Sequence, residues 1–137
     1  MVASSRVYSY SDNGGESWTR SETGHTSGQI SGIAYNNARF VAGAVDGGAV
    51  RLFYSDDYGD NWNEAVGSIG NVYSIIHGNG YFVAAGQSGR IGYSSDGINW
   101  IAVPGVFTGG LYSDIYDIVY TGSRFIAVGK GMAYCDF

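Results

Sequence analysis

Residues that favour α-helices are scarce in this 137-residue sequence, which has only two leucines, three glutamates and one lysine. This shortage excludes a helical bundle. Aromatic residues are plentiful, with three tryptophans, twelve tyrosines and six phenylalanines, and valine and isoleucine are also common. Such a composition predicts an all-β fold, and the 23 glycines beside a single proline indicate many tight turns. The length corresponds to one domain.

The sequence is equally poor in cysteine and in basic residues. A lone Cys135 excludes both an intramolecular disulfide and a thiolate metal cage. The net charge of −5, with Lys130 as the single lysine, offers no electrostatic footprint for nucleic acid or anionic lipid. No apolar run approaches the roughly 20 residues that span a bilayer, and the first residues lack the plan of a signal peptide. We therefore expect a soluble, cytoplasmic protein with no metal, cofactor, nucleic-acid partner or membrane contact.

Two phrases recur along the chain. One ends at each tryptophan, at positions 18, 62 and 100, and reads YSDNGGESW, YSDDYGDNW and YSSDGINW. The other follows each of these and reads IAYNNARFVAGA, IIHGNGYFVAAG and IVYTGSRFIAVG. The tryptophans lie 44 and 38 residues apart, so the repeating unit has about 40 residues.

Each unit predicts four short antiparallel strands. In the first complete unit these are residues 30–35, 39–44 and 51–55, followed by a last strand that begins at Trp62. Both faces of the predicted strands are apolar, which is typical of a sheet packed between two neighbouring sheets. Four-stranded sheets stacked radially are the blades of a β-propeller.

The phrase Ser-x-Asp-x-Gly-x-x-Trp resembles the Asp-box, also called the BNR or sialidase-like repeat. The resemblance implies a β-propeller in which each box forms the turn between the third and fourth strands of a blade. We expect a structural role, because the short polar side chain accepts backbone N–H bonds, glycine permits a positive φ and the indole fills the wedge between blades. The matching residues are Ser11, Asn13, Gly15, Trp18; Ser55, Asp57, Gly59, Trp62; and Ser94, Asp96, Gly97, Trp100.

The three boxes differ in detail. The first has Asn13 where the others have aspartate, the third is one residue shorter, and a fourth copy begins at Tyr134. A calcium site at Asp56, Asp57 and Asp60 is the weaker alternative for the second box, because the other boxes do not repeat this cluster.

The chain reads as a single repeat domain of about three blades. Residues 29–65 and 71–103 form complete blades, whereas residues 1–20 supply the third and fourth strands of a shared blade and residues 115–137 supply first to third strands. Three blades cannot close a ring without exposing apolar faces, such as those around Trp18 and Phe125.

We therefore predict a homodimer whose mixed blades complete a six-bladed propeller. One third strand is then duplicated, so either residues 133–137 or residues 6–10 are displaced. A fragment of a longer protein or a degenerate monomer is the alternative.

The sialidase-like resemblance raises the question of catalysis. Those enzymes use an arginine cluster, a tyrosine nucleophile paired with a glutamate, and an aspartic acid as proton donor. The three glutamates here lie in or just after the box turns, and Arg39 and Arg124 recur at one repeat position, which indicates a structural or interblade role. The two histidines have no metal-binding spacing, and His77 replaces a tyrosine of the other repeats, so we expect it to pack at a strand end. We assign no catalytic residue and predict that the protein is not an enzyme.

A binding or scaffolding module is the remaining function. Asp114 and Asp117 lie three apart on one strand and thus on opposite faces, so we do not expect them to act as a pair. Weak multivalent binding of a glycan, with a protein ligand as another choice, suits the polar loops. A sialidase-like glycoside hydrolase and a structural component of a larger particle are the alternatives. The candidate ligand-binding residues are Arg51, Arg90, Tyr112, Asp117 and His25.

Overall fold

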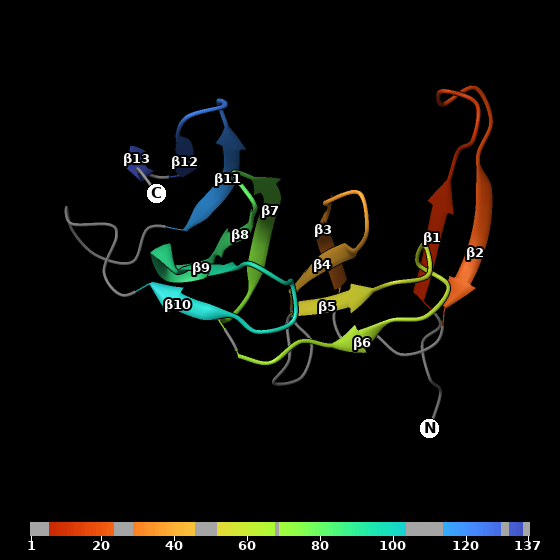
Figure 1. Ribbon diagram of the computed structural model, residues 1–137, viewed down its shortest axis with the longest axis horizontal. Helices are drawn as coiled ribbons and strands as arrows, with labels where there is room; N and C mark the ends of the chain where they lie inside the picture. Colours follow the sequence, from red (N-terminus) through yellow and green to blue (C-terminus); the bar gives the residue numbers. More distant parts are fainter. Residues whose placement is uncertain are drawn as a thin grey trace.

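The computed structural model describes residues 6–23, 29–45, 52–67, 69–103, 114–129 and 132–135. Within these segments the regular structure is β, apart from one 3-10 turn, η1 (Gln87–Gly89). The strands form four antiparallel sheets, each a meander in chain order (Figure 1). No helix in the described part of the chain combines the length and the apolar character needed to cross a membrane.

The described strands are grouped as two, four, four and three. The first sheet is β1 (Arg6–Tyr10) and β2 (Thr19–Thr23). The second is β3 (Gln29–Tyr35), β4 (Phe40–Val45), β5 (Leu52–Ser55) and β6 (Asn63–Glu64). The third is β7 (Val72–Gly78), β8 (Tyr81–Gly86), β9 (Ile91–Ser94) and β10 (Ile101–Val103). The fourth is β11 (Ile115–Tyr120), β12 (Phe125–Gly129) and β13 (Met132–Cys135).

These sheets confirm the all-β class and the four-stranded antiparallel sheets that the sequence predicts. The last strand of the second sheet is shorter than expected and starts one residue after Trp62. The described sheets do not close into a ring. Strands β1 and β13, of which one was expected to be displaced, are both paired in the single chain.

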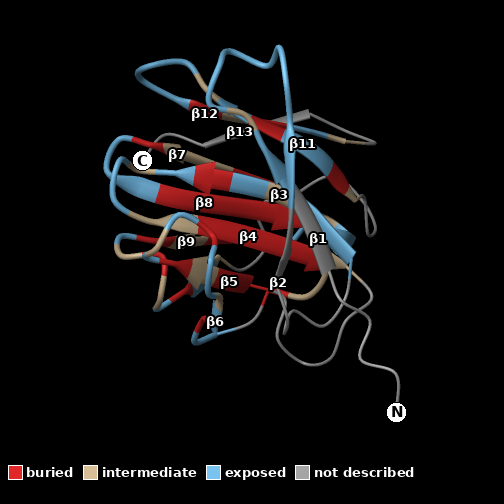
Figure 2. Cartoon of the chain, turned by 90° about the vertical axis from the view of Figure 1, so that its right-hand side faces the viewer, coloured by how far each residue is buried: buried red, intermediate tan, exposed pale blue. Residues whose placement is uncertain are grey.

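The four sheets lie one after another in chain order without closing into a ring, an arrangement called the fan below. The first strands of the last three sheets lie side by side, with β7 against both β3 and β11. Each of these strands carries a register shift near its start, between Ile30 and Gly32, Val72 and Ser74, and Ile115 and Asp117. The β1–β2 hairpin lies beside the second sheet, on the side away from the third (Figures 1 and 2). The order of the sheets in space therefore follows the chain.

Two apolar cores fill the spaces between the last three sheets, and the second strands of the four-stranded sheets, β4 and β8, are drawn mostly buried in Figure 2. Close approach between the second and third sheets requires glycine at position 43, because a Cβ there would lie 2.3 Å from a methyl carbon of Val72. The first core contains Ala34, Val41, Leu52, Ala65, Ile69, Val72, Ile75, Phe82, Ala84 and Trp100. The second contains Val83, Ala85, Ile91, Ile115, Ile118, Phe125 and Ala127.

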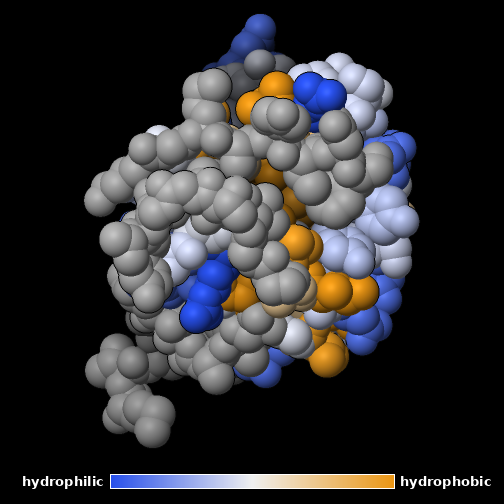
Figure 3. Space-filling model, turned by 90° about the vertical axis from the view of Figure 1, so that its left-hand side faces the viewer, coloured by the Kyte–Doolittle hydropathy of each residue, from blue (hydrophilic) through white to orange (hydrophobic). Residues whose placement is uncertain are grey.

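The two ends of the fan differ from the expectation at one residue. Phe125 is buried, because the fourth sheet turns this face towards the third sheet, so the prediction that it faces water is wrong. The opposite face of the fourth sheet carries Val119 and Val128, which are 47% and 41% exposed. Figure 3, viewed from the side where Figure 1 shows this sheet, has hydrophobic surface open to solvent.

Candidate functional site

The turn between β5 and β6 is held by hydrogen bonds among Ser55, Asp57, Gly59 and Asn61. The hydroxyl of Ser55 donates to Asp57 Oδ1 at 2.7 Å and accepts the backbone N–H of Gly59 at 2.9 Å. Asp57 accepts the backbone N–H of Asn61 at 2.8 Å and its side-chain amide at 2.7 Å. These bonds lower the pKa of Asp57 because they favour the carboxylate, and the bond from the Asn61 side chain has the largest effect.

The turn between β9 and β10 repeats this arrangement with one residue fewer. Ser94 donates to Asp96 Oδ1 at 2.9 Å and accepts the N–H of Gly97 at 2.8 Å. Asp96 accepts the N–H groups of Ile98 and Asn99, both at 2.8 Å, and the side-chain amide of Asn99 at 2.9 Å. Burial opposes ionisation of Asp96, but the bonds from Asn99, Ile98 and Ser94 outweigh it and hold the pKa far below its ordinary value.

The turn between β1 and β2 makes the same bonds without a charge. Ser11 donates to Asn13 Oδ1 at 2.9 Å and accepts the N–H of Gly15 at 2.9 Å. Asn13 accepts the N–H of Ser17 at 3.0 Å, and its amide donates to the Ser17 hydroxyl at 2.8 Å. An amide oxygen thus replaces the carboxylate at this position.

The three tryptophans that follow these turns are buried to different degrees. Trp100 is 8% exposed and belongs to the core between the second and third sheets. Trp62 is partly buried, and Trp18 is 65% exposed. The indoles of Trp18 and Trp100 nevertheless donate the same bond, to the carbonyls of Gly15 at 3.1 Å and Gly97 at 3.2 Å. The wedge role expected of the indole therefore applies to Trp100 and not to Trp18.

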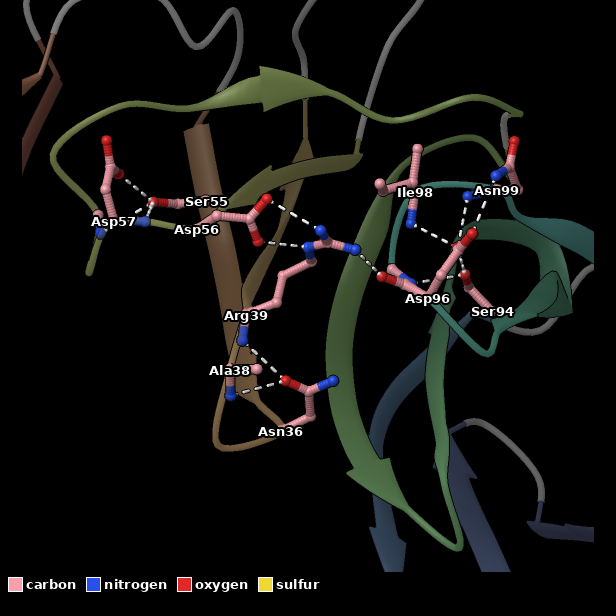
Figure 4. A network of polar contacts seen from close by, with 12 residues as sticks. Asn36, Ala38, Arg39, Ser55, Asp56, Asp57, Ser94, Asp96, Ile98 and Asn99 are labelled. Atoms are coloured by element: carbon pink, nitrogen blue, oxygen red, sulfur yellow. Dashed lines mark hydrogen bonds and ion pairs between the residues drawn. The ribbon is translucent and has the colours of Figure 1, made fainter.

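Arg39 connects the second sheet to the turn of the third sheet (Figure 4). Its guanidinium binds the carboxylate of Asp56 through two bonds, at 2.6 and 2.9 Å, and donates to the carbonyl of Asp96. It also lies 5.0 Å from the centre of the Tyr54 ring. The bond to Asp56 raises the pKa of Arg39 and lowers that of Asp56. These contacts join two sheets, which agrees with the structural role predicted for this arginine.

A cleft of about 410 Å³ lies between the β1–β2 hairpin and the second sheet. Sequence reasoning did not single it out, although the repeat itself contains the signal, since several of its residues correspond to neighbours of Arg39. Aromatic and acidic residues both line it, and Tyr58 is 79% exposed. The lining residues are Tyr10, Ser11, Asp12, Phe40, Tyr58 and Asp60.

Two of the predicted ligand-binding residues, Arg90 and Asp117, lie within the described residues. Arg90 precedes β9 and lies against Gly70, where a methyl group would come within 3.1 Å of its guanidinium. Asp117 in β11 accepts the Ser74 hydroxyl of β7 at 2.9 Å, so its carboxylate joins two sheets. Arg51, Tyr112 and His25 lie outside the described residues.

Asp114 and His77 also have partners within the described residues. Asp114 accepts the N–H of Ser88 at 2.9 Å, whereas Asp117 binds Ser74, so the two carboxylates have separate partners as expected. His77 packs on Phe82 with ring centres 4.8 Å apart, which confirms its packing role, and burial lowers its pKa. In the described segments, no group of three or more His, Cys, Asp or Glu side chains is placed to hold a metal ion.

An aromatic pair lies near the start of two adjacent first strands, β7 and β11. Tyr73 of β7 and Tyr116 of β11 occupy corresponding positions at the two register shifts, and their rings stack with centres 6.2 Å apart. Tyr116 is exposed and adjacent in sequence to Asp117.

Comparison of the whole chain with models of protein families and with curated proteins finds no match.

Proposed function

We propose that this chain is a subunit of a self-assembling β-propeller built from Asp-box repeats, and that the assembly acts as a non-catalytic binding or scaffolding module. Two copies would supply six blades. The fan of antiparallel sheets, with the first strands of its last three sheets side by side, supports a propeller arrangement.

The observation that carries the proposal is the difference between the middle and the ends of the fan. Both four-stranded sheets have neighbours on each side, and in β8 every residue but the first is buried. The end sheets have two and three described strands, and they leave Trp18, Val119 and Val128 in solvent. Exposed apolar side chains and unpaired strand edges are features that a protein covers by association.

Two copies related by a twofold axis would satisfy both ends at once. The β1–β2 hairpin of each copy would complete a blade begun by β11 and β12 of the other. Closed cyclic symmetry removes the free sheet edges, whereas an open fan would keep them.

Light scattering coupled to gel filtration tests this proposal. We expect a species of twice 14.5 kDa that persists on dilution. A 14.5 kDa monomer at every concentration would overturn it. A mass of three or more copies would retain self-assembly but exclude the six-bladed ring.

Binding of a glycan by the assembled ring is a second candidate, which the stacked pair of Tyr73 and Tyr116 supports. A tyrosine ring beside a carboxylate suits a sugar, because the ring can pack on the C–H face and the polar group can bind hydroxyls. A glycan array tests this candidate, with Tyr116→Ala as the matched variant. Turnover of a fluorogenic sialoside would instead favour the sialidase-like alternative, and the absence of both would leave a structural role in a larger particle.

A further inference from the structure

The cleft beside the β1–β2 hairpin has the composition of a site for a flat cation. Its lining combines the aromatic residues Tyr10, Phe40 and Tyr58 with the acidic residues Asp12 and Asp60. A guanidinium group stacks on aromatic faces and forms paired hydrogen bonds with carboxylates, so arginine suits such a lining better than a neutral ligand does.

The same repeat positions surround Arg39 one sheet further along the chain. The guanidinium of Arg39 contacts Tyr54 and Asp56, which correspond in the repeat to Tyr10 and Asp12 of the cleft. A methyl group placed on Gly97 would lie 3.3 Å from Arg39 Cδ and 3.2 Å from the Phe82 ring. Phe82 follows the turn of the third sheet as Phe40 follows the turn of the second, and Phe40 lines the cleft.

The hairpin has an edge where the strand that carries such an arginine would lie. Within the second sheet Arg39 immediately precedes β4, and β4 pairs with β5, with Phe40 opposite Ser55 and Val41 opposite Tyr54. Strand β1 takes the place of β5 in the first sheet, and among the described strands it pairs with β2. A strand like β4 added along β1 would therefore direct its preceding residue into the cleft.

Among the described sheets, one other second strand follows an arginine. Arg124 immediately precedes β12, as Arg39 precedes β4, and Tyr120 pairs with Phe125 as Tyr35 pairs with Phe40. Strand β12 lies in the fourth sheet, at the opposite end of the fan from the cleft (Figure 1). Arg124 can reach the cleft only from a second copy.

We propose that the cleft is a guanidinium socket for Arg124 of a second copy, whose β12 pairs along β1 with Phe125 opposite Ser11. This inference rests on the self-assembly proposed above and specifies its contact. Opposite charges meet in it, because the socket contributes Asp12 and the incoming strand contributes an arginine.

Strand β13 competes with β1 for the same place. In the single chain Phe125 is opposite Cys135 and Ile126 is opposite Tyr134, the register that β4 makes with β5. Exchange of one strand for the other replaces backbone hydrogen bonds in equal number, so the side chains decide the outcome. The hairpin also contributes β2 as a fourth strand, and the exchange therefore completes a four-stranded sheet.

Charge reversal at the two proposed partners tests the socket. We would measure the dissociation constant of the dimer by sedimentation for Asp12→Arg, for Arg124→Asp and for the double variant. Each single change should weaken the dimer by about tenfold or more, because it places like charges together, and the double variant should recover most of that loss. Glu16→Arg is the matched control, since it makes the same charge change in the same turn outside the cleft lining, and it should leave the constant within about threefold.

The outcomes separate the socket from self-assembly. A wild-type monomer would overturn both proposals. A wild-type dimer that Asp12→Arg leaves unchanged, or a double variant no tighter than the weaker single one, would overturn the socket alone. The socket would also be overturned if Asp136→Arg weakens the dimer while Asp12→Arg does not. Asp136 follows Cys135 in the sequence as Asp12 follows Ser11. Circular dichroism of each variant would show that the strands are retained.

Discussion

The turns at Ser11–Trp18 and Ser94–Trp100 have nearly the same internal hydrogen bonds and opposite surroundings. In each, a serine hydroxyl accepts a glycine N–H, and the indole donates to a glycine carbonyl. Trp18 is largely exposed, whereas Trp100 is buried against the second sheet. The turn thus forms from residues within four positions of one another, and the stability it adds depends on the sheet that precedes it.

Truncation of the two indoles should separate these contributions most clearly. Trp100→Ala should lower the free energy of unfolding by about 3–5 kcal/mol, because it removes a buried aromatic side chain. Trp18→Ala should cost less than about 1 kcal/mol in the dilute single chain, where the ring is in water. Urea unfolding of both variants at low concentration measures the difference. Equal losses would contradict the contrast between the two turns.

The glycines of the two turns should differ next. Gly15 and Gly97 both have positive φ, +93° and +75°, so alanine strains the backbone at either position by about 1 kcal/mol. A Cβ at Gly97 would also lie 2.6 Å from Val41 Cγ2, while one at Gly15 meets nothing closer than 4.0 Å. We expect Gly97→Ala to cost about 2–3 kcal/mol and Gly15→Ala about 1. Thermal unfolding of the two variants measures both losses of stability. A larger loss for Gly15→Ala than for Gly97→Ala would contradict the prediction.

The serines should show a smaller difference in the same direction. Ser94→Ala leaves the buried N–H of Gly97 without its acceptor and should cost about 1–3 kcal/mol. Ser11→Ala exposes the N–H of Gly15 to water, which can replace the hydroxyl, so we expect a loss below about 1 kcal/mol. Urea unfolding of the pair provides the comparison, and similar losses would show that the neighbouring sheet does not matter here.

These contrasts also explain what the sequence could predict. The strands and turns could be predicted because the sequence repeats with a period of about 40 residues. The hydrogen bonds of each turn join residues two to four positions apart, so a short sequence motif determines them. The burial of Phe125 and the exposure of Trp18 depend on which sheet lies opposite each residue. The repeat motif is the same in each sheet, so it does not show which copies are buried. The cleft required the further step of aligning Asp12 with Asp56, the partner of Arg39.

The charge at the third residue of the turn should produce the smallest effect, and it should depend on pH. The folded pKa of Asp96 lies below its ordinary value of 3.8, so its contribution to stability is present above that value and is lost as the pH falls towards the folded pKa. Asp96→Asn keeps an acceptor, as Asn13 does in the first turn, but cannot titrate. We expect the wild type to exceed this variant in stability at pH 7 and the gap to narrow between pH 4 and pH 2, measured by urea unfolding. Asn13→Asp is the converse change, and it should make the stability of the exposed turn sensitive to acid. A difference in stability between the wild type and Asp96→Asn that stays constant with pH would show that Asp96 contributes only as a hydrogen-bond acceptor and not through its charge.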